Sequence, residues 1–117
     1  MRHYVWLPEN CDLGFLPGRE LLQVCIRKHE IVLVFDEAVT ITMECHSELR
    51  PTPDRQAIVA PPEALSRLLG SKIARVVRSG KGDIQIDFTN SSTLVVKDSN
   101  TDYESYQIRS RSNTIIV

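Results

Sequence analysis

The sequence predicts an α+β fold that is mostly β. Two antiparallel three-stranded meander repeats, at about 18–45 and 70–98, are joined by a connector and one short helix, 61–69. Apolar and polar residues alternate in several short runs, most clearly in 83–88. This period of two is typical of strands with one buried face. Turn-forming Asn, Ser, Gly and Asp residues separate the runs, and a single stretch has the apolar spacing of a helix.

The length and composition indicate one globular domain spanning 1–117. A chain of 117 residues, of which 42% are hydrophobic, is long enough to bury a core without metals or disulfides. The formal net charge is −1, whereas dedicated nucleic-acid binders carry a basic face. We therefore expect a folded domain that does not bind nucleic acid.

Cysteine usage and the N-terminal segment favour a cytoplasmic protein. Cys11, Cys25 and Cys45 are odd in number and widely spaced, and no CxxC motif occurs, so a reducing compartment fits better than a disulfide framework. Pro8 and acidic residues interrupt the N-terminal segment before a signal-peptide core can form. No run approaches the ~20 apolar residues of a membrane span, so we expect no membrane partner.

The first half of the chain contains four predicted strands. A short edge strand is expected at 3–7, and 21–27 follows with Leu22, Val24 and Ile26 on one face. The run 31–35 is apolar at every position, which indicates an interior strand covered on both sides. The run 40–45 alternates, with Ile41, Met43 and Cys45 facing inward.

The connector, 46–60, contains Pro51 and Pro53 and is expected to lack regular structure. The helix, 61–69, begins with two prolines and Glu63, which suit a first helical turn, and Gly70 is its stop. A helix this short is held by docking rather than by propensity.

In the second half, strands are expected at 73–78, in the hairpin 82–97 and, in short form, at 103–109 and 114–117. The hairpin turns at 89–92, where Asn and Ser favour a tight turn.

The two meanders align as an internal repeat. Gly18 matches Gly70 at an offset of 52 residues, and Phe35 matches Phe88 at an offset of 53 after one inserted residue. The alternative is that two meanders of equal length look alike. Neither meander can bury its apolar face alone, so we expect the two to pack together or to join edge to edge.

Several motifs follow one another in a fixed order: the Gly-led strands, the aliphatic-Phe-Asp strand, the LxxLLG helix at 65–70, the hairpin and a terminal Tyr-Glu-x-aromatic motif at 103–106. In this order they resemble a family of small bacterial cytosolic proteins of unknown function, often linked to toxin–immunity systems. The likeness covers roughly 12–117, with Asn-Ser-Ser in the hairpin turn where the family has Asp-Gly, and Tyr106 where it has Trp. The resemblance implies a protein that binds and blocks a toxin domain.

Four alternatives are weaker. Asp83 and Asp87 share one strand face, and paired carboxylates occur in hydrolases, although a solvated strand face is the commoner explanation for them. Cys45 and His46 are consecutive strand residues and point to opposite faces, so no catalytic residue is assigned. No close-spaced ligand pair indicates a metal, and no cofactor is expected. A basic loop at 109–113 follows clustered acids that would repel phosphate.

We therefore expect a non-catalytic immunity protein that occludes a toxin domain, most simply a basic nuclease. Acids facing a basic surface speed association, and tyrosines serve as anchors. The alternative is a structural or homodimeric assembly domain that pairs through the edge strand 114–117, so either a monomer or a homodimer is consistent with the sequence. The candidate partner-binding residues are Glu37, Glu44, Asp83, Asp87, Asp98, Asp102, Tyr103, Glu104 and Tyr106.

Overall fold

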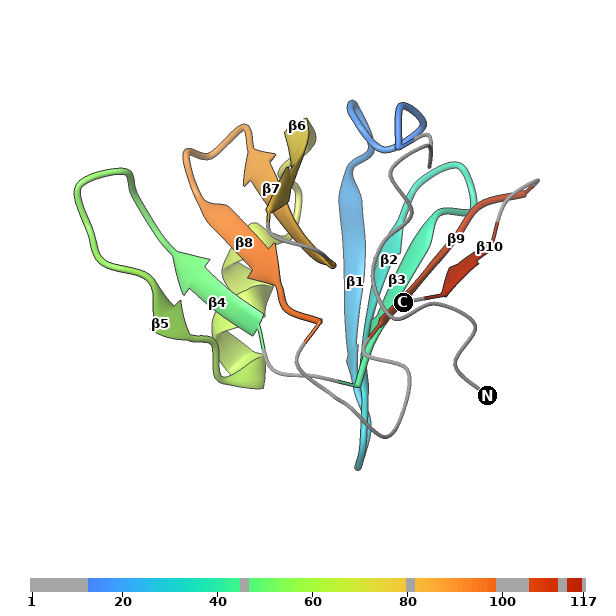
Figure 1. The fold of residues 1–117 in the computed structure, drawn as a ribbon, viewed down its shortest axis with the longest axis horizontal. Coiled ribbons are helices and arrows are strands. Elements are labelled where there is room, and N and C mark those ends of the chain that lie inside the picture. Colours follow the sequence, from blue (N-terminus) through green and yellow to red (C-terminus); the bar gives the residue numbers. More distant parts are fainter. Residues whose placement is uncertain (1–12, 45–46, 80–81, 99–105, 112–113, 117) are drawn as a thin grey trace.

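The computed structural model describes residues 13–44, 47–79, 82–98, 106–111 and 114–116, which form two antiparallel five-stranded sheets (Figure 1). The predicted mostly-β α+β fold is thereby confirmed. Sheet 1 has the order β1-β2-β3-β9-β10 and sheet 2 the order β5-β4-β8-β7-β6. The strands of sheet 1 are β1 (Leu21–Ile26), β2 (Ile31–Phe35), β3 (Thr40–Met43), β9 (Tyr106–Arg109) and β10 (Thr114–Ile116). Those of sheet 2 are β4 (Ser47–Arg50), β5 (Ile58–Val59), β6 (Ile73–Ser79), β7 (Asp83–Phe88) and β8 (Thr93–Val96).

The two predicted meanders are β1-β2-β3 and β6-β7-β8, and each is completed by strands from the other half of the chain. β4 follows β3 in sequence but pairs with β8, where Leu49 lies opposite Leu94. β9 follows β8 but pairs with β3, where Ile108 lies opposite Ile41. The halves therefore exchange their last two strands, and neither sheet forms from one half alone.

A short antiparallel contact joins the starts of the two meanders. Glu20 and Lys72, which occupy equivalent positions in the repeat, form an isolated bridge. Four backbone hydrogen bonds surround this bridge in two equivalent pairs, as expected for an approximate two-fold axis that passes between the two residues. They run from Gly18 N to Ile73 O (2.7 Å), from Gly70 N to Leu21 O (2.9 Å), from Leu21 N to Ser71 O (2.9 Å) and from Ile73 N to Arg19 O (2.8 Å).

The first strand of each meander has a matching irregularity in its pairing. The register shifts between Leu21 and Gln23 in β1, and between Ile73 and Arg75 in β6. Such bulges re-aim the side chains of a strand. In β1 the bulge turns Leu21 into the core and leaves Leu22 56% exposed, so Leu22 does not share a face with Val24 as predicted, and Ile26 at the strand end is 57% exposed.

The repeat also extends further toward the N-terminus than the sequence comparison from Gly18 indicates. Leu16 and Leu68 are both fully buried and lie two residues before the equivalent glycines. Leu16 O accepts a hydrogen bond from Arg19 N (3.1 Å), and Leu68 O accepts one from Ser71 N (3.0 Å). The same local turn therefore positions both leucines.

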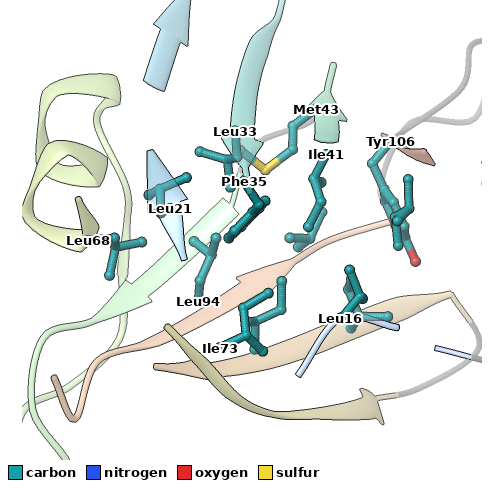
Figure 2. Close-up of a cluster of buried hydrophobic side chains, with 14 of the residues drawn as sticks. Leu16, Leu21, Leu33, Phe35, Ile41, Met43, Leu68, Ile73, Leu94 and Tyr106 are labelled. Atoms are coloured by element: carbon teal, nitrogen blue, oxygen red, sulfur yellow. The ribbon is translucent and has the colours of Figure 1, made fainter. Parts of the chain in front are cut away.

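One core lies between the inner faces of the two sheets (Figure 2). Leu33 and Phe35 come from sheet 1, Ile73 and Leu94 come from sheet 2, and Leu68 comes from the helix. All five are at most 2% exposed. Since apolar burial is the dominant favourable contribution to folding, this shared core couples the two halves.

The predicted helix is present as the 3₁₀-helix η1 (Pro62–Leu68), which packs against β1. No side chain caps its N-terminus, and the Ser66 hydroxyl donates to the Glu63 carbonyl within the helix (2.6 Å). Two prolines at the start and a length of seven residues leave little room for α-helical bonds. Leu65 and Leu68 are buried, as the apolar spacing predicts.

The expectation that the connector lacks regular structure is wrong. β4 and β5 lie within 46–60 and pair with each other, Glu48 opposite Val59 and Leu49 opposite Ile58. In β4 only Leu49 is a buried apolar residue. A single apolar position does not form an alternating pattern, so this strand could not be predicted from sequence. The predicted strand 3–7 lies outside the described residues.

Candidate functional site

The outward side of sheet 2 carries a continuous row of side chains across all five strands. The register aligns Val77, Gln85, Val95, Glu48 and Val59 as cross-strand neighbours. Val77 is 39% and Val59 62% exposed, and the other three are half-buried. We call this surface, together with the two ionic rows beside it, the outer face of sheet 2.

The first ionic row runs through Arg75, Asp87, Thr93 and Arg50, again as direct cross-strand neighbours. Arg75 Nη2 lies 2.9 Å from Asp87 Oδ2, and Arg75 Nε donates to the same oxygen (3.1 Å). The other oxygen, Oδ1, accepts from the Thr93 hydroxyl (2.9 Å) and from the Gln85 amide (3.2 Å). Both oxygens of Asp87 are therefore engaged.

These contacts determine the protonation of Asp87. Burial alone would raise the pKa of its carboxyl group, but hydrogen bonds from Thr93, Arg75 and Gln85, with the positive charge of Arg75, outweigh burial and lower the pKa below its ordinary value. Asp87 is therefore a firmly ionised group that holds its neighbours in place.

The second ionic row contains Asp83 and Lys97. Asp83 Oδ2 lies 3.2 Å from Lys97 Nζ, and Asp83 Oδ1 accepts a hydrogen bond from the backbone N of Asp98 (2.8 Å). Asp98 is half-buried beside this pair. The expectation that Asp83 and Asp87 form an exposed acidic patch is wrong, because each is balanced by a cation on a neighbouring strand or just beyond it.

The remaining described acids of the predicted site lie elsewhere. Glu37 is exposed in the turn between β2 and β3, where its φ of 58° helps to close the hairpin. Glu44 is exposed just beyond the other end of β3. Both belong to the opposite sheet from Asp83 and Asp87 (Figure 1), so the structure does not gather these acids on one surface. Asp102, Tyr103 and Glu104 lie outside the described residues.

Tyr106 is not a surface anchor. Its side chain is 1% exposed and lies in the core (Figure 2), where its hydroxyl donates to Gly82 O. A buried tyrosine needs such a partner for its hydroxyl group. The expectation that Tyr106 is an aromatic anchor for a partner is therefore wrong, because Tyr106 lies opposite the buried Met43 and shares its inward face.

Two hollows border the outer face of sheet 2. One of about 230 Å³ lies where the β4–β5 loop meets the sheet, and its lining includes Arg50, Arg55, Gln56, Gln85 and Thr93. The other, of about 500 Å³, opens between β6 and the loop at 13–17. The first hollow could not be predicted from the sequence, because it depends on the pairing of β4 with β8.

The outward side of sheet 1 offers a contrast. Its central row consists of Cys25, Val32, Thr42, Gln107 and Ile116, all uncharged. Cys25 is a free, half-buried thiol and Val32 is 9% exposed. In the row on one side of it, Arg109 is the charged member among the described residues, and on the other side Arg27 Nη1 lies 2.8 Å from Glu30 Oε2 at the end of the β1–β2 hairpin.

Within the described residues, no cluster of three or more His, Cys, Asp or Glu side chains is arranged to hold a metal ion. None of the helices in the described part of the chain is long and apolar enough to cross a membrane.

Comparison with known proteins places the chain in a family. Residues 16–117 match the model of a family of unknown function, DUF6188, and the chain belongs to this family. The matched region contains both sheets and η1. No curated protein and no solved structure matches the chain significantly.

Proposed function

We propose that this protein is a non-catalytic immunity protein of the cytoplasm, which binds a bacterial toxin domain through the outer face of sheet 2 and occludes it. One observation supports this most directly: valines at 77, 95 and 59 alternate with Gln85 and Glu48 in the central row, and ionic rows flank it. A mixture of apolar side chains with charged and hydrogen-bonding groups is typical of a non-obligate protein–protein interface.

The paired ions suit this role. Arg75 with Asp87 and Lys97 with Asp83 are held in fixed positions by neighbouring strands. Preordered charges fix the register of a partner and select against wrong ones. Because the two pairs carry no net charge, the pairs themselves give no preference for a basic partner over an acidic one.

The proposal is tested by placing a bulky charge at the centre of the face. Val77→Arg should weaken binding to the polypeptide encoded by the neighbouring gene by at least about tenfold, since burying an unpaired charge at an interface is costly. The matched control is Leu22→Arg, which alters an exposed apolar residue on the first strand of the other sheet.

Both variants should retain the wild-type melting temperature, because exposed substitutions usually change stability by under about 0.5 kcal/mol. Loss of toxin protection with Val77→Arg alone supports the proposal. Equal protection by both variants, with unchanged affinity, contradicts it.

A second candidate is a homodimer formed through β10. Among the described strands, β10 pairs only with β9 and forms an edge of sheet 1. Exposed edges can add a strand from a second copy. Sedimentation at micromolar concentration distinguishes a dimer of this kind from a monomeric inhibitor.

A further inference from the structure

Arg50 is the residue whose surroundings are least explained by the fold. Its Nε atom is buried and has no hydrogen-bond partner within the described part of the chain. Buried donors in proteins are nearly always paired, and an exception points to a group that is supplied from elsewhere. The carboxylate of Asp87, one strand beyond Thr93, does not serve Arg50, because its oxygens accept from Arg75, Thr93 and Gln85.

A second arginine faces the same space. Arg55 belongs to the β4–β5 loop, and it lines the hollow of about 230 Å³ together with Arg50. No ion pair or side-chain hydrogen bond of Arg55 is found among the described residues. Gln56 and Thr93 add polar groups to the wall. The hollow is therefore rich in hydrogen-bond donors and carries positive charge.

We propose that this hollow binds a carboxylate group of the protein partner, contributed by an Asp or Glu side chain or by a chain terminus. The inference rests on the proposed function and specifies the chemistry by which the partner is anchored. The planar guanidinium of arginine matches a carboxylate with two parallel hydrogen bonds. Asp87, ionised behind Thr93, opposes a doubly charged phosphate more than a singly charged carboxylate.

The neighbouring strand β5 is placed to contact the residues of the partner that adjoin the bound carboxylate. Ile58 and Val59 follow the hollow directly in sequence and are 52% and 62% exposed. β5 is also an edge strand of sheet 2. A carboxylate held by Arg50 thus places adjoining residues of the partner against exposed apolar side chains at the sheet edge.

The repeat supplies a matched control. Arg109 lies opposite Thr40 in sheet 1 as Arg50 lies opposite Thr93 in sheet 2. Arg109 is exposed, so replacing it removes the same charge from an equivalent strand position outside the hollow.

The direct experiment is an NMR titration that follows the Nε–H resonance of Arg50. A blocked glutamyl peptide should shift this resonance to saturation, whereas the glutaminyl peptide should leave it unchanged. Arg50→Gln should abolish the peptide-induced shifts of Thr93 and Gln85, and Arg109→Gln should preserve them. Inorganic phosphate is titrated in parallel, and tighter binding of phosphate than of peptide would overturn the carboxylate assignment.

Binding to the polypeptide encoded by the neighbouring gene separates this inference from the proposed function. Arg50→Gln should weaken that binding at least about tenfold, with Arg50→Lys intermediate because it retains charge without the planar fork. Thermal melting verifies that each variant is folded, and Arg50→Lys serves as the test if Arg50→Gln is not. If Val77→Arg abolishes binding but Arg50→Gln and Arg50→Lys do not weaken it, the carboxylate anchor is wrong and the proposed function stands.

Discussion

Asp87 lies on the outward side of β7, yet it is among the most heavily bonded side chains of the described chain. Thr93, Gln85 and Arg75 all donate to its carboxylate. These bonds favour the ionised form, and a group whose folded-state pKa lies below its unfolded value stabilises the fold only while it is ionised. Asp87 therefore contributes both to the charge pattern of the outer face of sheet 2 and to the stability of the fold.

Replacing this carboxylate should make the free energy of unfolding depend less on pH in the acid range. Asp87→Asn is expected to cost about 1 kcal/mol at neutral pH, since charge-assisted bonds are lost. Because the pKa of Asp87 is lowered in the folded state, its contribution is present above the unfolded pKa and disappears as the pH falls through the folded pKa. Urea unfolding from neutral to acid pH should show the two proteins converging.

Glu44→Gln, which changes an exposed acid, is the control for that series. A constant difference between Asp87→Asn and the wild type at every pH would show that Asp87 acts only through packing.

At the scale of elements, a buried leucine followed two residues later by a glycine with positive φ occurs before the first strand of both meanders. Leu16 in the loop before β1 and Leu68 at the end of η1 are both fully buried, each two residues before a glycine with positive φ, Gly18 at 90° and Gly70 at 84°. The surrounding hydrogen bonds match across the repeat. The loop before β1 and the 3₁₀-helix η1 therefore occupy equivalent positions in the repeat.

Truncating either leucine should have the same effect. Leu68→Ala and Leu16→Ala are each expected to destabilise the fold by roughly 2–4 kcal/mol, as for other fully buried leucines. Leu69→Ala, which alters a side chain 46% exposed, is the control. A loss under about 0.5 kcal/mol for Leu68→Ala in urea unfolding would mean that η1 does not contribute to the core.

The two glycines give a second paired prediction. A Cβ at Gly18 or Gly70 has no heavy atom within 4 Å, so substitution by alanine meets only the backbone cost of positive φ, about 1–2 kcal/mol. Equal losses in urea unfolding are expected for Gly18→Ala and Gly70→Ala. A loss at one site only would show that the local equivalence of the repeats does not extend to their energetics.

The strand elements could be predicted where alternation was long and clean. The pattern of 83–88 identified β7 and its inward residues, whereas β4 has one buried apolar residue and was assigned to a connector. Tyr106 was placed on the surface because the sequence does not show that Met43 is its neighbour. Local alternation predicts which face of a strand is apolar, but it does not show which other strand lies beside it.

At the scale of the whole molecule, the exchange of strands is the decisive feature. β4 and β9 each cross to the other half, which places Arg50 beside Thr93 and builds the hollow from segments far apart in sequence. The candidate site depends on this pairing, so no local motif could reveal it. The described acids among those proposed from sequence lie on both sheets, with the two on β7 already balanced by cations.

The central claim is that the outer face of sheet 2 binds a protein partner. Methyl NMR of the valine and isoleucine side chains, recorded while the polypeptide encoded by the neighbouring gene is added, provides the most direct test. We expect the methyl signals of Val77, Val95 and Val59 to shift or broaden at stoichiometric addition, while those of Val34 and Ile116 on sheet 1 stay in place. Perturbation of the sheet 1 methyls alone, or of none, would contradict it.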